Sequence, residues 1–330
     1  MSTNLKKYIY KPIAIPPGET LLEFLESLSM SQRELAMRMG RPLKLVNEII
    51  KGKASITSET AIQLEAVFGK EAAFWTRLET DYQEALARVE SEKELKAEIT
   101  EASVLLYQEM AGNGWVPKVT TEIEIVKNLL SFFGVTSLKN IVENKFLAPV
   151  LYKMSKVKKT DPLAAAAWLR KGTIEAQKIQ TVSFNENTLK DKIAIIRELT
   201  EKTADIFVEE IGKNLAEAGV AFTITKGLRN VPINGASRWL SPEKAVIQLS
   251  IYGKSADKFW FSLFHEIGHL LMHSKKEYNI DLKETSNLDL KEAEANEYAK
   301  NILIPKEEYQ KFVSTNSLNS INITNFSKKI

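Results

Sequence analysis

The sequence predicts an α+β fold that is mainly helical and carries one small β-sheet. Two observations lead to this prediction. Apolar residues recur at three- and four-residue spacing over most of the chain, and from Val220 to Ser250 the pattern becomes alternating. A third observation divides the chain, because two glycines, an asparagine and a proline interrupt the helical pattern between Met110 and Pro117. We therefore expect an N-terminal helical bundle over residues 1–88, a helical connector over 89–165 and a second domain over 166–330.

The composition excludes several classes of protein. With 44% hydrophobic and 26% charged residues, the chain is an ordinary globular one and not a fibre or a disordered tail. No run approaches the roughly 18 apolar residues of a membrane span, and the first residues lack the apolar stretch of a signal peptide. We therefore predict a cytoplasmic protein with no membrane partner. The absence of cysteine leaves His, Asp and Glu as the only ligands for a metal, and there are only three histidines.

The first 86 residues predict five short helices between Glu19 and Leu86. Ser31 with Glu34, and Ser58 before Ala61, are typical of helix starts. Glycines at positions 40, 52 and 69 stand where helices are expected to end. The charged stretch that follows contains no glycine or proline and is predicted to extend the fifth helix as a connector.

The second half predicts further helices, then three short strands within residues 220–227, 234–240 and 244–250. Two more helices are expected over 256–273 and 290–304, the latter ending before Pro305. The central block 119–182 carries no motif that indicates a function.

A positively charged helical pair indicates a nucleic-acid site. The net charge of the chain is only +3, but the segment from Ser31 to Lys53 contains six basic and two acidic residues. In a helix-turn-helix, one helix crosses the DNA backbone and the next enters the major groove. The alternative is a solvated helical face, which is the commoner meaning of a charge run. The candidate DNA-binding residues are Gln32, Arg33, Arg41, Lys44, Asn47 and Lys51.

Residues 17–82 resemble the Xre-type helix-turn-helix of antitoxin-like transcription regulators. The resemblance includes the terminal FW, followed by Leu and Tyr. It implies binding to double-stranded DNA, and we expect a homodimer that spans two half-sites and a toxin as a candidate partner. Pro42 and Leu43 depart from the family, which usually has small polar residues there. Sequence-specific reading is therefore expected to be weak, with Arg41 and Lys44 contacting phosphates.

The motif HEIGH predicts a metal site. His265 and His269 are one turn apart on a helix, so both rings can bind one ion, and zinc suits this spacing. Glu266 lies about 100° further round and can instead act as a general base on a water at the metal. Gly268 suggests that another element packs closely against this helix.

The third ligand is expected on the following helix. His273 is about 12 Å from His265 along an unbroken helix, which is too far, and is expected to end the helix with a partly charged ring that favours the helix dipole. A better candidate is Glu292, with Asn296 one turn later as a hydrogen-bond partner for a histidine. Glu294 is the alternative to Glu292.

The pair HEIGH and EAEAN, followed by YAKNILIP, is similar to the ImmA/IrrE family of zinc metallopeptidases over roughly residues 168–305. The resemblance implies a zincin-like domain with one Zn²⁺ per chain, completed by the carboxylate that opens the second motif, here Glu292. The last residues stop in mid-pattern, so this domain is expected to be cut short at its C-terminus.

Two functions remain in view. In the first, the protein is a DNA-associated zinc metalloendopeptidase that cleaves a protein or peptide substrate such as a transcriptional repressor. In the second, it is an antitoxin-like transcription regulator whose zincin-like domain senses a ligand or partner without cleavage. For the first, Tyr298, Tyr278 and Arg238 are candidate donors to the oxyanion, and the strand 244–250 is a candidate site for pairing with an extended substrate.

Overall fold

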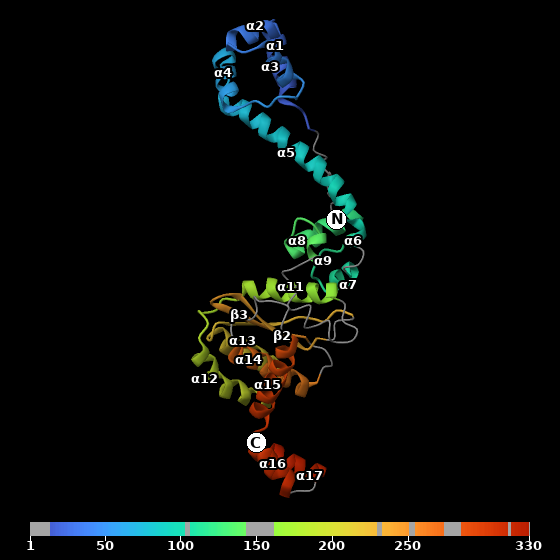
Figure 1. Cartoon of the computed structure of the whole chain (residues 1–330), viewed down its shortest axis with the longest axis vertical. Helices are drawn as coiled ribbons and strands as arrows, with labels where there is room; N and C mark the ends of the chain where they lie inside the picture. The colour runs from blue at the N-terminus through green and yellow to red at the C-terminus, as the bar shows by residue number, and fades with distance from the viewer. Residues whose placement is uncertain are drawn as a thin grey trace, which may run out of the picture. The chain divides into compact units, whose positions relative to one another are not determined.

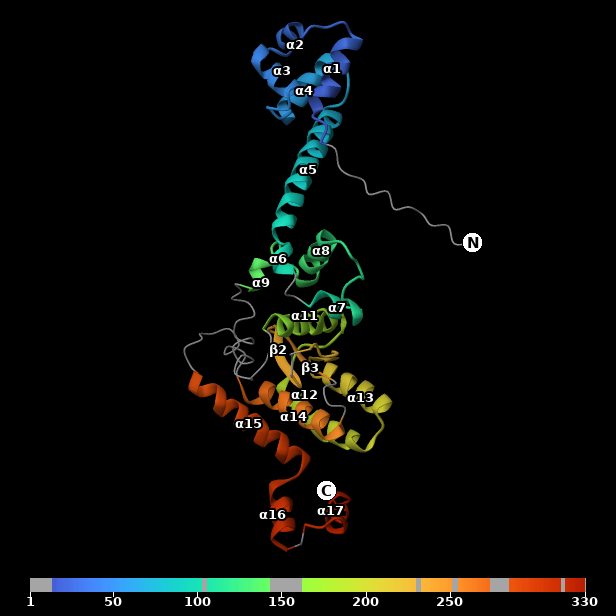
Figure 2. The same ribbon diagram turned by 90° about the vertical axis from the view of Figure 1, so that its right-hand side faces the viewer.

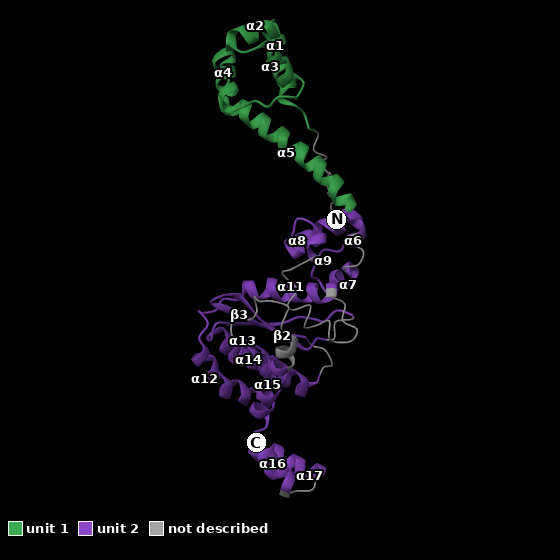
Figure 3. Cartoon of the chain, viewed as in Figure 1, with its two compact units in different colours: residues 1–97 green, residues 98–330 purple. Residues whose placement is uncertain are grey.

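The computed structural model describes residues 14–102, 106–142, 162–229, 233–250, 255–273, 285–315 and 318–329. It is mainly helical with one small sheet, as predicted (Figure 1). The chain divides into two compact units, residues 1–97 and 98–330 (Figure 3). The finer division at residues 88 and 165 stays a prediction.

The first unit contains the five predicted helices: α1 Pro17–Ser27, α2 Gln32–Met39, α3 Leu43–Ile50, α4 Ser58–Phe68 and α5 Ala72–Ala97. The Ser31 hydroxyl caps α2 by accepting the Glu34 N–H at 3.1 Å. Gly40 ends α2 with φ of 62°, a conformation that glycine adopts without steric cost. The expected cap at Ser58 is wrong by one residue, because the Thr57 hydroxyl accepts the Thr60 N–H.

Trp75 is the centre of the first unit's core. Its ring is fully buried and lies within 5.1–5.7 Å of the rings of Phe24, Phe68 and Phe74. Leucines of α1, α2 and α4 surround it. The core fixes how α2 and α3 lie beside each other, so the outward side chains of these two helices form one surface.

The second unit begins with four short helices: α6 Ile99–Ala102, α7 Tyr107–Gly112, α8 Glu122–Phe133 and α9 Lys139–Val142. Then come α11 Pro162–Lys178, α12 Glu186–Glu198 and α13 Ala204–Ala216. The three predicted strands follow as β1 Val220–Ile224, β2 Gly235–Ser241 and β3 Lys244–Leu249. The last helices are α14 Ala256–Met272, α15 Thr285–Leu303, α16 Lys306–Thr315 and α17 Ser320–Ser327. None of the helices in the described part of the chain is long and apolar enough to cross a bilayer.

The sheet has the strand order β1-β3-β2, with β1 parallel and β2 antiparallel to β3. Helix α11 covers one face and α14 the other, which gives three layers (Figures 1 and 2). Ala221 and Val246 point toward Ala176 of α11, while Phe222 and Ile247 join the core shared with α14.

The position of β3 corrects one expectation. Strand 244–250 was expected to be available for pairing with a substrate, but β3 is the central strand and is hydrogen-bonded on both sides. One edge of β3 pairs with β1 and the other pairs with β2, so β3 has no open edge for a substrate. The strand at the edge near α14 is β2.

Candidate metal centre and nucleic-acid interface

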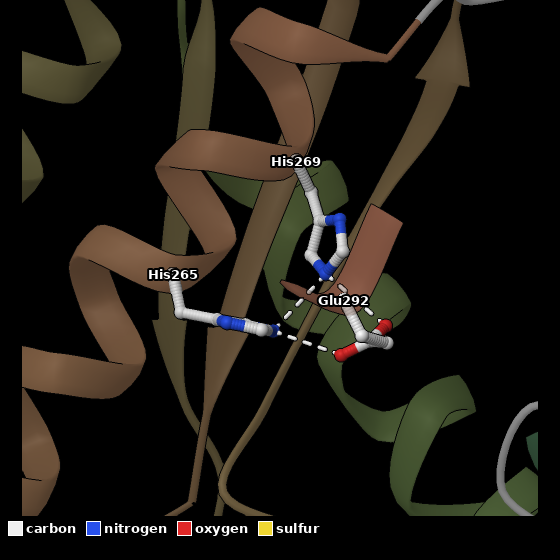
Figure 4. Close-up of side chains that lie close together, drawn as sticks. All are labelled: His265, His269 and Glu292. Carbon is white, nitrogen blue, oxygen red and sulfur yellow. Dashed lines mark hydrogen bonds and ion pairs between the residues drawn. The ribbon is translucent and has the colours of Figure 1, made fainter. Parts of the chain in front are cut away.

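Three of the predicted site residues meet between α14 and α15 (Figure 4). The Nε2 atoms of His265 and His269 are 3.0 Å apart. The two carboxylate oxygens of Glu292 each lie 3.3 Å from one of these nitrogens. His269 is almost fully buried, while His265 and Glu292 are partly exposed. The cluster therefore has one open side.

Close packing of α14 on α15 brings the cluster together. A side-chain carbon at Gly268 would lie 3.0 Å from the Tyr298 ring and 3.4 Å from the Ala295 backbone. Gly268 thus allows the close approach that its place in the motif predicts. The small residues Ala295 and Ala299 are fully buried on the facing side of α15. Because the helices touch here, Glu292 reaches the histidine face from one turn before Ala295.

The separation of the two histidine nitrogens is close to that of two ligands of a tetrahedral zinc ion. Ligand atoms about 2.05 Å from zinc, at tetrahedral angles, lie about 3.3 Å from one another. The two histidine nitrogens are 3.0 Å apart, and each lies 3.3 Å from a different oxygen of Glu292. One ligand atom from each of the three residues lies within 4.8 Å of the others. Two imidazoles and one carboxylate with an open side are also the donor set of a catalytic site rather than a closed structural one. The residues therefore fit the metal, and their role as its ligands stays a proposal.

Glu266 lies beside this cluster and is not part of it. Its side chain is 6% exposed, and the Ser237 hydroxyl of β2 donates to its Oε2 at 2.7 Å. The next residue of β2, Arg238, points to the other face of the sheet. Its guanidinium donates to the Leu169 carbonyl at 2.8 Å and to the Thr173 hydroxyl at 3.0 Å.

Arg238 is half-buried and adds positive charge near Glu266. Burial lowers the pKa of Arg238 to about 10, and the charge of Glu266 opposes this shift. Arg238 therefore remains cationic at neutral pH. Because its Nη2 already donates to two groups of α11, Arg238 is a poor donor for an oxyanion.

Two tyrosines were the other candidate donors. Burial raises the pKa of Tyr298 to about 12, so its hydroxyl stays protonated and able to donate. Tyr278 lies outside the described residues. Asn296 is half-buried one turn after Glu292 on α15, and its hydrogen bond to a histidine stays a prediction.

His273 ends α14, as predicted, and takes an extended backbone conformation there. Glu294 lies near this residue, with 4.0 Å between its Oε2 and the His273 Nδ1, and is not in the cluster. The expectation that His273 carries charge favoured by the helix dipole is wrong. Burial and the neighbouring His269 lower its pKa below 6.5, which outweighs the opposing effects of the Lys291 carbonyl and Glu294.

This shift predicts a loss of stability in acid. As the pH falls below 6.5, the unfolded chain binds a proton at His273 before the folded chain does, so protonation favours unfolding. In metal-free protein, the drop in urea midpoint between about pH 7.5 and about pH 5.5 should be smaller for His273→Gln than for the unmodified chain. An equal drop in both proteins would contradict the prediction.

The candidate nucleic-acid surface is formed by α2 and α3. Arg33, Lys44 and Lys51 are exposed, whereas Gln32 and Asn47 are half-buried. The Lys44 side chain is 83% exposed, and its ammonium is 3.8 Å from Glu48. Arg41 differs from the other basic residues, because its guanidinium pairs with Glu59 at 2.5 Å and donates to Gln63 at 3.0 Å. A phosphate would have to compete with these contacts to α4.

Comparisons with known proteins match both regions. Residues 21–75 match the family model described as helix-turn-helix, and residues 231–317 match the IrrE N-terminal-like domain of a peptidase family. An HTH-type transcriptional regulator of Escherichia coli, YddM, is 35% identical over 77 residues, which cover 23% of this chain and 78% of that protein. The chain belongs to the helix-turn-helix transcription regulators, here fused to an IrrE-like peptidase domain.

Further relatives each match about a quarter of the chain or less. Virulence-associated protein I of Dichelobacter nodosus is 36% identical over 70 residues. The match covers 21% of this chain and 65% of that protein. An antidote protein of the HigA family from Coxiella burnetii is 37% identical, with 27% of this chain and 96% of that chain covered at a TM-score of 0.24. PA4674 of Pseudomonas aeruginosa, solved with its operator DNA, is 34% identical. The match covers 23% of this chain and 82% of that chain at a TM-score of 0.22.

Sequence reasoning missed the strand residues that touch Glu266 in the IrrE-like domain. Ser237 donates to its carboxylate, and a side-chain carbon at Gly235 would lie 3.0 Å from its Cγ and Oε1. The only available signal was a Gly-Ala-Ser strand start, which has no metal or catalytic meaning by itself.

A cavity of about 810 Å³ lies in the same unit, and its lining does not include the three clustered residues or Glu266. Phe261 lines it from α14, and its ring lies 6.1 Å from the His265 ring in a stacked arrangement. Asn234, which precedes β2, and Ile304, which follows α15, line other parts of the cavity.

Proposed function

We propose that this protein is a DNA-associated zinc metalloendopeptidase that cleaves a protein substrate, such as a transcriptional repressor. The observation that carries the proposal is the cluster of His265, His269 and Glu292, whose ligand atoms lie within 4.8 Å of one another, with Glu266 next to the cluster and outside it. A regulator that only sensed a ligand would have no need for a carboxylate in this place.

The residues divide into two roles. His265, His269 and Glu292 would hold the metal, which when bound supplies a Lewis acid that activates water and polarises the scissile carbonyl. Glu266 accepts the proton of the attacking water and then donates it to the departing amine. Tyr298, whose hydroxyl stays protonated, is the remaining described candidate for a donor to the carbonyl oxygen.

The substrate is proposed to bind as an extended peptide along β2. This strand forms the edge of the described sheet on the side opposite β1, and an edge strand can pair with an added peptide through its backbone. Since Gly235 and Ser237 of β2 approach Glu266, a peptide on this strand would pass close to the proposed base.

The helix-turn-helix domain is proposed to bind double-stranded DNA as a homodimer and so to keep the peptidase domain close to regulated promoters. Support comes from the exposed basic residues on α2 and α3 and from the likeness to a transcriptional regulator. A toxin is a further candidate partner, since residues 17–82 resemble antitoxin-like regulators.

Metal content is the first test. Freshly purified protein should contain about one zinc per chain by mass spectrometry, because three protein ligands suffice for tight binding. His269→Ala and Glu292→Ala should each lose most of this zinc, since each removes one ligand. His273→Ala is the matched control and should keep it, because His273 is not in the cluster.

Zinc that remains in both ligand variants would contradict the proposed site. A different result would favour the alternative of a regulator that senses without cleavage. In that case both ligand variants lose zinc, but the zinc-loaded wild-type protein cleaves no protein of a cell extract.

A further inference from the structure

The contact between β2 and Glu266 suggests positioning residues for the proposed reaction, and this inference rests on the proposed function. A glutamate side chain has three rotatable bonds, so a carboxylate next to a metal site is not held in place by its helix alone. In this chain, one face of β2 provides two restraints on Glu266.

The first restraint is a hydrogen bond. The Ser237 hydroxyl donates to Oε2 of Glu266 at 2.7 Å, between residues 29 positions apart in the sequence. Glu266 is 6% exposed, so this bond replaces hydration that the carboxylate has lost. A hydrogen bond to a charged acceptor is stronger than one between neutral groups and fixes the direction of the oxygen.

The second restraint is steric. Gly235 lies two residues before Ser237 and therefore on the same face of the strand. A side-chain carbon there would lie 3.0 Å from Cγ and Oε1 of Glu266 and 2.8 Å from a methyl of Leu249. The missing side chain at Gly235 leaves the space that the carboxylate occupies.

We propose that Ser237 and Gly235 are positioning residues that hold Glu266 in the orientation needed for a general base. They act only through Glu266. Because β2 is also the strand on which the substrate is proposed to lie, the peptide and the base are aligned by one element. A shift of β2 would move both together.

The hydrogen bond is tested first in metal-free protein, without any activity assay. Ser237→Ala should lower Tm by about 2–4 °C, because it leaves a buried carboxylate without its donor. In a Glu266→Ala background the same change should lower Tm by less than about 1 °C. Ser241→Ala, at the end of the same strand, is the matched control and should give equal shifts in both backgrounds. Equal shifts for Ser237→Ala would overturn the proposal.

The positioning role is tested in zinc-loaded protein with a cleavable substrate. Ser237→Ala should lower kcat by about 10–100-fold, with KM and zinc content unchanged, because a displaced base slows the chemical step rather than binding. Gly235→Ala should also lower kcat with zinc content unchanged, because the added carbon meets Glu266 and Leu249. Ser237→Thr, which keeps the hydroxyl, should restore most of the rate.

The two failures are distinguishable. If the wild-type protein cleaves nothing, the proposed function fails, and the Tm comparison still decides whether Ser237 holds Glu266. If the wild-type protein cleaves and kcat is unchanged in Ser237→Ala, the positioning role is wrong and the proposed function stands.

Discussion

Glu266→Gln is expected to lower kcat for peptide cleavage by about 10²–10⁴-fold while the zinc content stays at the wild-type level. The amide has nearly the same shape and can still accept the Ser237 hydrogen bond, but it cannot take a proton from water. Glu266 is not in the cluster of metal-ligating groups, so its replacement should leave zinc binding intact. Cleavage by zinc-loaded wild-type and variant proteins, with metal content measured on the same samples, checks this result.

Glu294→Gln provides the matched control. It removes a carboxylate from the neighbouring helix, where the side chain is 55% exposed and lies near His273 rather than near the cluster. Its kcat should stay within about twofold of wild type, as expected of a surface change away from the site. If Glu266→Gln cleaves as fast as this control, Glu266 is not the base.

The histidine pair could be predicted from the sequence because its geometry is local. On any α-helix, residues four apart lie on one face, so His265 and His269 were expected to meet before the fold was known. The choice between Glu292 and Glu294 was less local. It depends on how α15 is rotated against α14, and that rotation follows from the contact of Gly268 with Ala295 and Tyr298.

Contacts that depend on strand order could not be predicted in the same way. The alternating pattern gave the three strands, but no local signal showed that β3 would pair with both β1 and β2. The contact of Ser237 with Glu266 additionally requires the register between β2 and β3, in which Ser237 is opposite Ile247. Such contacts follow from packing of distant segments rather than from residue spacing.

The protonation of His273 and the ion pair of Arg41 could not be predicted from the sequence either. A histidine at the last turn of a helix is usually favoured in its charged form by the helix dipole. For His273, burial and the nearby His269 reverse this preference and lower the pKa. Similarly, Arg41 reads as a phosphate contact in the sequence, whereas its guanidinium already pairs with Glu59 and Gln63.

Lys44→Ala combined with Lys51→Ala is expected to weaken binding to duplex DNA by about 10–100-fold at roughly 0.1 M salt. Both side chains are exposed on α3 or just after it, and Lys44 has only a 3.8 Å ion pair with Glu48 to give up. Each lost phosphate contact lowers the slope of log K against log salt by about 0.9, so the slope should fall by about 1.8. Titration of a labelled random-sequence duplex at several salt concentrations measures both quantities.

The control replaces two exposed lysines of the second unit, Lys190 and Lys300, and should leave the affinity and the slope unchanged. Since the net charge changes equally in the two double variants, a difference between them assigns the effect to the helix-turn-helix surface and not to overall charge. Equal losses in both variants would mean that the DNA attraction is unspecific. No salt-dependent affinity in the wild-type protein would instead make this domain a module for binding another protein, because phosphate contacts by lysine cannot be independent of salt.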